Sequence, residues 1–345
     1  MCQQKIRVED AVGMALAHDI TEIKRDGFKG AAFKKGQVIQ EADLCRLQKL
    51  GKRHLYILQI EAGYLHEDEA ALAMAQAFCG PGVCFRDEPR EGKINLLAAH
   101  DGLLKVNVEA LTAINLLEEV MCASRHTDFT VKAGDIVAGL RAIPLVIHSG
   151  IINQAVALAG ENGGLFQVKP FRRARVGMVI TGSEVFAGLI DDQFEPVLRS
   201  KIDRVGSQTQ GVAFAPDDAD YIAGAIRDFL AQGVDLLLVT GGMSVDPDDV
   251  TRLGIKQAGA VDFLYGAPVL PGAMLMLAAI DGVPVLGIPA CGLYHETTVF
   301  DLVLPRILAG ETITRQDLAR LGHGGLCLHC PECRFPRCAF GKGAV

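Results

Sequence analysis

Short, uninterrupted apolar runs alternate with helix-like stretches between residues 174 and 310, and this alternation restricts the fold more than any other feature of the chain. The runs are VGMVI (176–180), LLLV (236–239) and VPVLGIP (283–289). Such runs are typical of strands that are buried on both faces of a sheet. Helix-like stretches also occur here: FEPVLRSKIDRVG, DADYIAGAIRDFLAQG and DVTRLGIKQAG. Strands and helices that alternate in this way form right-handed crossovers, so the sequence predicts an α/β domain with a mostly parallel sheet.

Length and pattern divide the chain into four predicted parts. A chain of 345 residues is long enough for two or three domains with sizeable cores. We expect residues 1–60 to form a small α+β domain and residues 61–173 a middle α+β domain without a recognisable catalytic pattern. Residues 174–310 are the parallel α/β domain, and residues 311–345 are a cysteine-rich tail.

Composition argues against some classes of function. Asp and Glu outnumber Lys and Arg, which gives a formal net charge of -7. A sequence-independent nucleic-acid binder needs clustered cationic side chains instead, so no nucleic-acid partner is expected. The first ten residues, MCQQKIRVED, lack the apolar core of a signal peptide, and a cytoplasmic location is therefore expected.

The window 273–292 is apolar enough to resemble a membrane span, with Asp281 as its single charge. However, Asp281 and Gly282 form a hairpin turn signal, and Pro284 and Pro289 interrupt any helix. Two buried strands joined by a tight turn are predicted instead, and no membrane contact is expected.

Three loops rich in small residues follow the predicted strands. They are TGSE (181–184), TGGMSVDPDD (240–249) and PACG (289–292). Ligands of such sheets bind outside the carboxyl ends of the strands, and small residues let backbone amides approach an anion. Neither Thr-Gly loop contains GxGxxG or GxxxxGK[ST], so a dinucleotide or P-loop site has no support.

Three aspartates in the second loop have two interpretations. Asp248 or Asp249 could cap the following helix, which is worth about 0.5 to 2 kcal/mol. A cap explains one carboxylate, but three carboxylates beside an anion site would repel the ligand. A magnesium ion shared by Asp246, Asp249 and the ligand's oxygens would remove that conflict, because Mg²⁺ binds through one or two carboxylates plus substrate oxygens.

The motifs VGMVITGSEV with GLIDD, DLLLVTGGMSVDPDDVT, YGAPVLPGAM and VLGIPACG resemble a known family over residues 174–310. This segment resembles the molybdopterin-binding domain shared by MoeA, MogA and gephyrin, and so implies a MogA-like three-layer fold. The whole chain is most similar to uncharacterised MoeA-like proteins that share a Cys-rich ending.

The resemblance implies a pterin site and a catalytic site. The implied pterin-binding residues are Thr181, Gly182, Ser183, Glu184, Thr240, Gly241, Gly242, Met243, Ser244, Pro271, Gly272 and Pro289. Asp192 falls where the family has an acidic residue that handles molybdate or magnesium, and Asp246 and Asp249 join it as catalytic candidates. Two family lysines are missing, because Leu270 and Ala273 stand where transferases usually read KPGKP.

Two functions follow from the resemblance. The first is an enzyme, a molybdopterin molybdenumtransferase that inserts molybdenum from molybdate into adenylylated molybdopterin with magnesium. The second is a non-catalytic carrier or sensor of finished cofactor, which uses its tail to dock on a molybdoenzyme or another cofactor-biosynthesis protein. The intact aspartates favour the first function and the missing lysines favour the second. Family members usually self-associate, so a homo-oligomer is expected.

The tail contains a dense group of cysteines. Cys327, Cys330, Cys333 and Cys338 have the spacing CxxCxxCxxxxC. Four thiolates within twelve residues can hold one tetrahedral zinc ion or a 4Fe-4S cluster. Both metals stay open, with zinc favoured slightly because histidines lie nearby.

Overall fold

The computed structural model describes residues 4–14, 16–23, 29–57, 60–161, 163–243 and 250–343. The chain divides into two compact units. One comprises Met1–Ala99, Val106–Arg125 and Ala133–Val168, and the other comprises His100–Lys105, His126–Lys132 and Lys169–Val345. The finer division into four domains stays a prediction.

The first unit begins with a small body of strands and short helices. Its elements are β1 (Gln4–Arg7), η1 (Val8–Ala11), β2 (Ile20–Ile23), β3 (Lys29–Phe33), η2 (Glu41–Asp43), α1 (Leu44–Lys49) and β4 (His54–Ile57). Strands β1 and β4 form one antiparallel pair, and β2 and β3 form another. Leu16, Phe33 and Leu47 are buried together with other apolar side chains and make its core.

The rest of the first unit packs helices on an antiparallel sheet. Its elements are β5 (Tyr64–His66), α2 (Glu67–Phe78), β6 (Val83–Cys84), β7 (Lys93–Ala98), α3 (Val108–Asn115), β9 (Val120–Ser124), β11 (Ile136–Ala142), β12 (Val146–His148), α4 (Ser149–Gly160) and β13 (Phe166–Lys169). The strand order is β6-β7-β11-β9. Helix α2 packs against β7 and β11, and α4 packs against α2.

The second unit is built on a six-stranded sheet with the order β15-β14-β16-β19-β18-β17. Its strands are β14 (Arg175–Thr181), β15 (Gln208–Ala215), β16 (Leu236–Thr240), β17 (Val261–Tyr265), β18 (Met276–Ile280) and β19 (Val283–Ile288). Strands β15, β14, β16 and β19 are parallel to one another, whereas β18 and β17 add antiparallel pairings at one side. The predicted mostly parallel α/β sheet is confirmed.

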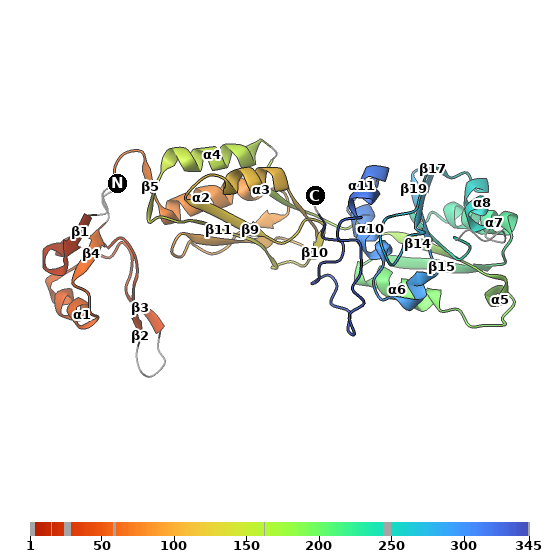
Figure 1. Cartoon of the computed structure of the whole chain (residues 1–345), viewed down its shortest axis with the longest axis horizontal. Helices are drawn as coiled ribbons and strands as arrows, with labels where there is room; N and C mark the ends of the chain where they lie inside the picture. Colours follow the sequence, from red (N-terminus) through yellow and green to blue (C-terminus); the bar gives the residue numbers. More distant parts are fainter. Residues whose placement is uncertain are drawn as a thin grey trace. The chain divides into compact units, whose positions relative to one another are not determined.

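Helices cover both faces of this sheet (Figure 1). They are α5 (Ser183–Phe186), α6 (Phe194–Arg204), α7 (Ala219–Ala231), α8 (Thr251–Gln257), α9 (Cys291–Tyr294), α10 (Val299–Leu308) and α11 (Arg315–Arg320). Successive side chains of a strand point to opposite faces. Met178 and Leu238 accordingly pack with α6 and α10, whereas Val179 and Leu237 pack with α7 and α8. The result is the three-layer arrangement that the resemblance implied.

The apolar window 273–292 forms two strands, as predicted. β18 and β19 are antiparallel neighbours, and the turn between them uses Asp281 and Gly282 with φ of 49° and 80°. Positive φ at both central residues is the geometry of a tight hairpin turn. Among the described residues, no helix has the length and apolar character that a membrane span requires.

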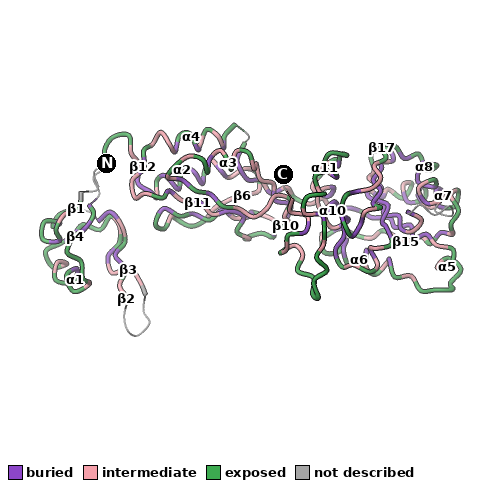
Figure 2. The backbone as a smooth tube through the Cα atoms, in the orientation of Figure 1, coloured by how far each residue is buried: buried purple, intermediate pink, exposed green. Residues whose placement is uncertain are grey.

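The second unit also contains the tail and an antiparallel strand pair. Strand β8 (Gly102–Val106) pairs with β10 (Phe129–Val131), and the two strands are not consecutive in the chain. An ion-pair network joins β8 to the start of the tail. Glu311 lies 2.9 Å from Lys105 Nζ and 2.8 Å from Arg306 Nε, and Arg306 also bonds Asp317 at 2.8 Å. Beyond α11 the tail has little regular structure, and residues 328–334 are exposed (Figure 2).

Candidate ligand pocket

The loops that follow β14, β16 and β19 lie side by side at one edge of the sheet. Ile180 near the end of β14 pairs with Thr240 at the end of β16, and Thr240 pairs with Ile288 at the end of β19. The segments that begin at Gly182, Gly241 and Pro289 therefore leave neighbouring parallel strands at their carboxyl ends. This is the edge at which open α/β sheets bind ligands.

Buried threonines hold the first two loops together. Thr181 Oγ1 donates a hydrogen bond to Thr240 O at 2.6 Å and lies 3.1 Å from Thr251 Oγ1. Thr240 Oγ1 is buried and has no hydrogen-bond partner among the residues that the structure describes. Both Thr181 and Thr240 are thus buried beneath the loops and do not line open space.

Two adjacent glycines are required at the start of the second loop. Gly241 and Gly242 have φ of 77° and 51°. A Cβ at Gly241 would lie 2.4 Å from Thr181 Oγ1, and one at Gly242 would lie 2.3 Å from Thr251 Oγ1. Because both positions combine a left-handed backbone with close contacts, only glycine fits without strain.

A cavity of about 650 Å³ opens at this edge of the sheet. It brings together six of the predicted pterin-binding residues: Gly241, Gly242, Met243, Pro271, Gly272 and Pro289. These residues come from separate loops, and the first and last of them, Gly241 and Pro289, are 48 positions apart in the sequence. The volume lies within the range of about 300 to 1,000 Å³ that is usual for small-molecule pockets.

The turn at Pro271 and Gly272 is fixed by the start of α10. Val299 N donates a hydrogen bond to Pro271 O at 3.2 Å. Gly272 has φ of 121°, and a Cβ there would lie 2.5 Å from Val299 Cγ1. A larger residue would therefore push the turn away from the helix and change the cavity wall.

The rest of the cavity wall is mostly apolar. Its other lining residues are Leu270, Ala273, Met274, Ala290, Cys291, His295, Leu326 and His329. Among the described residues that line it there is no Lys or Arg. Cys291, His295 and His329 supply the polar side chains, and burial raises the pKa of the Cys291 thiol. The rings of His295 and His329 lie with centroids 5.1 Å apart.

The predicted TGSE residues do not line this cavity. Thr181 is buried beneath the loops, and Glu184 is exposed. Ser183 is bound to Asp217, because Ser183 N and Oγ both donate to Asp217 Oδ2, at 2.9 and 2.8 Å. Gly182 has open space around it, since a Cβ there would lie 4.0 Å from Val185 Cγ2.

The catalytic candidates are also separate from the cavity or outside the described residues. Asp192 Oδ1 accepts a hydrogen bond from Phe194 N at 2.9 Å, and Asp192 Oδ2 accepts one from Glu195 N at 2.7 Å. Its carboxylate therefore caps α6. The predicted residues Ser244, Asp246 and Asp249 lie outside the described residues. The roles of all these residues stay predictions.

The tail cysteines line a second cavity of about 330 Å³ in the same unit. All four of Cys327, Cys330, Cys333 and Cys338 contribute to its wall, together with His295 and His329. Within the described part of the chain, their donor atoms do not converge into a group of three within 4.8 Å. The structure thus places the four cysteines around one space without showing a formed metal centre.

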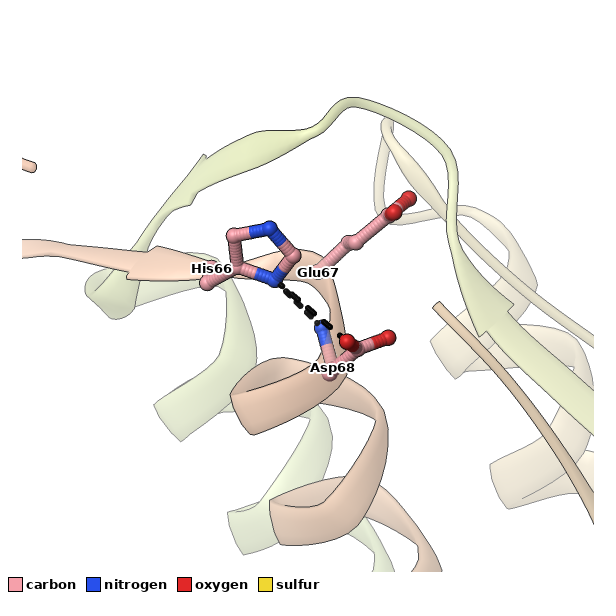
Figure 3. Close-up of side chains that lie close together, drawn as sticks. All are labelled: His66, Glu67 and Asp68. Carbon is pink, nitrogen blue, oxygen red and sulfur yellow. Dashed lines mark hydrogen bonds and ion pairs between the residues drawn. The ribbon is translucent and has the colours of Figure 1, made fainter. Parts of the chain in front are cut away.

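A compact group of possible metal ligands occurs instead at the start of α2 (Figure 3). His66, Glu67 and Asp68 have donor atoms within 4.8 Å of one another. However, Lys35 Nζ lies 2.5 Å from both His66 Nδ1 and Asp68 Oδ2. His66 Nδ1 also accepts a hydrogen bond from Asp68 N, and His66 Nε2 lies 3.0 Å from Ala17 O. The Lys35 ammonium already supplies the cation, so we assign this group a helix-capping role.

Sequence reasoning missed the contribution of the tail to the first cavity. Leu326 and His329 reach it because Leu270 and Leu326 form a β-bridge. Leu270 and Leu326 are 56 positions apart, and no local sequence pattern predicts a bridge between them. His295 follows α9 directly. Its position in the sequence, close after the PACG loop, was the one feature that could have predicted that it lines the cavity.

Residues 177–309 match the sequence profile of the family described as "Probable molybdopterin binding domain". Residues 5–59 match a domain of unknown function (DUF8806).

Two curated relatives are similar to parts of the chain. Molybdopterin molybdenumtransferase from Synechococcus elongatus is 28% identical over 143 residues, which is 39% of this chain and 36% of the relative. A CinA-like protein from Mycolicibacterium vanbaalenii is 35% identical over 78 residues, which is 23% of this chain and 18% of the relative. The chain therefore spans well under two thirds of the length of either relative.

Two solved structures are similar at lower identity. The tungsten cofactor synthesizing protein MoaB from Pyrococcus furiosus is 16% identical, with a TM-score of 0.32, and the match covers 40% of this chain and 97% of that one. The molybdopterin biosynthesis MoeA protein from Pyrococcus horikosii is 17% identical, with a TM-score of 0.32, over 71% of this chain and 79% of that one. The profile match confirms the resemblance inferred from the motifs: this chain contains, over residues 177–309, a domain of the molybdopterin-binding family.

Proposed function

We propose that this chain binds molybdopterin at the carboxyl edge of its parallel sheet and acts in molybdenum cofactor biosynthesis, in the cytoplasm and as a homo-oligomer. The observation that carries the proposal is the cavity of about 650 Å³, in which six pterin-loop residues from separate loops come together. Met243, Leu270 and Pro271 give the cavity an apolar wall that suits the ring system of a pterin, and glycine amides suit its phosphate.

In the first form of the proposal the chain inserts molybdenum into adenylylated molybdopterin. Gly241 and Gly242 would let the backbone approach the phosphate closely. Asp246 and Asp249 would hold magnesium, and Asp192 would help to place molybdate. A bound magnesium ion would supply Lewis-acid chemistry at the phosphate. It would also supply positive charge, since no Lys or Arg lines the described part of the cavity.

A second candidate is a carrier or sensor that binds finished cofactor without turnover. A specific observation favours it, because Asp192 lies outside the cavity wall and both of its carboxylate oxygens accept backbone hydrogen bonds. Leu270 and Ala273, which replace the family's lysines, add to this support. A carrier needs the pterin-binding surface and a docking element, and the tail would serve as the second.

Binding and turnover can be separated in one experiment. Full-length protein is incubated with adenylylated molybdopterin, and binding is measured by equilibrium dialysis for wild type, Gly241→Val and the control Gly224→Ala. A Cβ at Gly241 meets Thr181 at 2.4 Å, whereas one at Gly224 has no neighbour within 4 Å among the described residues. We expect binding to be lost in Gly241→Val alone. Absence of binding by wild type would reject the pterin proposal, and equal binding by all three proteins would reject this cavity as the site.

Turnover is then measured by adding molybdate and magnesium and following AMP release. The insertion form predicts release by wild type and a strong loss in Asp192→Asn. That substitution keeps an oxygen acceptor for one of the two capping hydrogen bonds, so the fold should survive. Tight binding without AMP release by wild type would reject insertion and leave the carrier.

A further inference from the structure

We propose that the cysteine-rich tail binds one thiophilic metal ion, zinc, in its 330 Å³ cavity, and that the metal-loaded tail forms part of the wall of the neighbouring ligand pocket. The inference rests on the proposed function only for the identity of the pocket's ligand. The metal site and its coupling to the pocket wall stand on contacts within the second unit.

The tail is joined directly to the turn that lines the ligand pocket. Leu270 N donates to Gly325 O at 2.8 Å, and Cys327 N donates to Leu270 O at 2.8 Å. Gly325 fits here because a Cβ would lie 2.4 Å from Leu321 O and 2.7 Å from Pro268 O. The first tail cysteine therefore shares a hydrogen bond with the residue that precedes Pro271.

The two cavities share part of their walls. His295, Leu326 and His329 line both the 650 Å³ pocket and the 330 Å³ cavity. His295 follows α9, whereas His329 lies between the first two tail cysteines. Anything that fixes the tail backbone at 326–330 therefore fixes one side of the ligand pocket.

The donor set of the smaller cavity suits a soft metal. Four thiols and two imidazoles line one space, and zinc in structural sites takes four sulfur or nitrogen ligands. Cys333 Sγ lies 3.3 Å from Thr297 Oγ1, and this contact holds the Cys333 side chain at the cavity wall. Cys327 and Cys338 pack against the apolar core, whereas Cys330 and Cys333 are exposed.

One segment of the tail, residues 328–334, lacks the packing that would fix it without a metal. Residues 328–334 are all exposed and contain no helix or strand. Metal binding to such a segment contributes directly to its folding, because the liganded state is ordered relative to the free one. A bound ion would thus order the backbone that forms the pocket wall.

The test measures zinc binding and pocket order on the full-length chain, without pterin. Metal-free protein is titrated with zinc, and bound metal is counted after gel filtration. We expect one zinc ion per chain for wild type and for the control Cys45→Ser/Cys84→Ser, and loss of that zinc in Cys330→Ser/Cys333→Ser. The metal content of protein purified without oxygen is measured in parallel, and iron in place of zinc would overturn the zinc assignment.

Coupling is read from amide hydrogen exchange at Leu270 and Cys327, the two donors of the bridge. Zinc is expected to slow their exchange by about tenfold or more in wild type and not in Cys330→Ser/Cys333→Ser. Zinc binding without any change at Leu270 would overturn the coupling, and absence of zinc binding would overturn the metal site. Neither result depends on pterin binding, so failure of the proposed function would be seen separately in the dialysis experiment.

Discussion

The sheet and the tail of the second unit are stabilised in opposite ways. Strands β14 and β16 are buried along nearly their whole length, and helices pack on both of their faces. The tail beyond α11 buries Phe340, but most of its side chains are exposed or only partly covered. The sheet therefore fixes Gly241, Gly242 and Pro289 without a ligand, whereas the tail depends on a few specific contacts.

Because of this difference, the sheet and the tail contribute to the ligand pocket in different ways. The parallel strands place Gly241, Gly242 and Pro289 at one edge by backbone hydrogen bonding and apolar burial. The tail adds Leu326 and His329 through one β-bridge and the ion pairs around Glu311. The sheet thus determines where the ligand site lies. The shape of the pocket also depends on whether the tail holds Leu326 and His329 in the wall.

The sharpest test of the contrast is a pair of leucine substitutions. Leu238 is 0% exposed in the middle of β16, whereas Leu328 in the tail is 78% exposed. Leu238→Ala leaves a cavity in the core and should lower the free energy of unfolding by about 2 to 5 kcal/mol. Leu328→Ala should change it by less than about 0.5 kcal/mol. Urea denaturation followed by circular dichroism measures both, and similar losses would contradict the contrast.

A glycine pair tests whether the second loop is fixed by the sheet. Gly241→Ala combines φ of 77° with a contact of 2.4 Å to Thr181 Oγ1, and should cost about 2 to 3 kcal/mol. Gly224→Ala lies inside α7 with no atom of the described residues within 4 Å of its Cβ, and should stabilise by about 0.5 to 1 kcal/mol. Denaturation midpoints of the two variants should move in opposite directions. Equal midpoints would mean that the loop rearranges freely around Thr181.

The strands that could be predicted from the sequence are those buried on both faces of the sheet. The runs at 176–180, 236–239 and 283–289 lie in strands covered on both faces, so every position is apolar and the pattern is plain. β15 (Gln208–Ala215) and β17 (Val261–Tyr265) lie at the two edges of the sheet, where burial is incomplete. Their sequences mix polar and apolar residues, and neither strand was predicted from an apolar run.

The pocket could be predicted only in part for a related reason. The Thr-Gly and Pro-Gly signals are local, and they identified the loops that follow the strands. Leu326 and His329 line the pocket because Leu326 pairs with Leu270. Such a long-range pairing leaves no local pattern in the sequence. Asp192 shows the converse case, since its place two residues before Phe194 and three before Glu195 is also typical of a helix cap, and the structure shows that contact.

A third pair of variants addresses the ion pairs that anchor the tail. Burial opposes ionisation of Glu311, but hydrogen bonds from Arg306 and Lys105 outweigh it and lower its pKa to about 2. Glu311→Gln leaves the cations without their shared carboxylate and should cost about 2 kcal/mol at pH 7. The control Glu332→Gln lies in the exposed part of the tail and should cost less than about 0.5 kcal/mol. Thermal unfolding at low salt distinguishes them, and equal shifts would argue against an anchoring role for Glu311.

The smallest expected effect is the pH dependence that Asp317 contributes. Burial opposes its ionisation, but hydrogen bonds from Arg306 and Thr314 outweigh it and lower the pKa of Asp317 to about 2. A carboxylate whose pKa is lower in the folded state stabilises the protein above its unfolded value near 3.8, and this contribution is lost as the pH falls through about 2. Because the side chain is partly solvated, we expect about 1 kcal/mol in place of the full linkage value.

Asp317→Asn should therefore lower the free energy of unfolding at pH 6 and have a much smaller effect at pH 2, where about half of the folded wild-type molecules have lost the charge and little of its contribution to stability remains. Asn retains an oxygen that can accept the cap hydrogen bond from Thr314 N, so the difference between the two pH values reports the ion pair with Arg306. Denaturant melts of both proteins at pH 6, 4, 3 and 2 give the curve. A constant difference at every pH would assign the loss to the cap, and the tail would then be anchored at this point by a neutral contact.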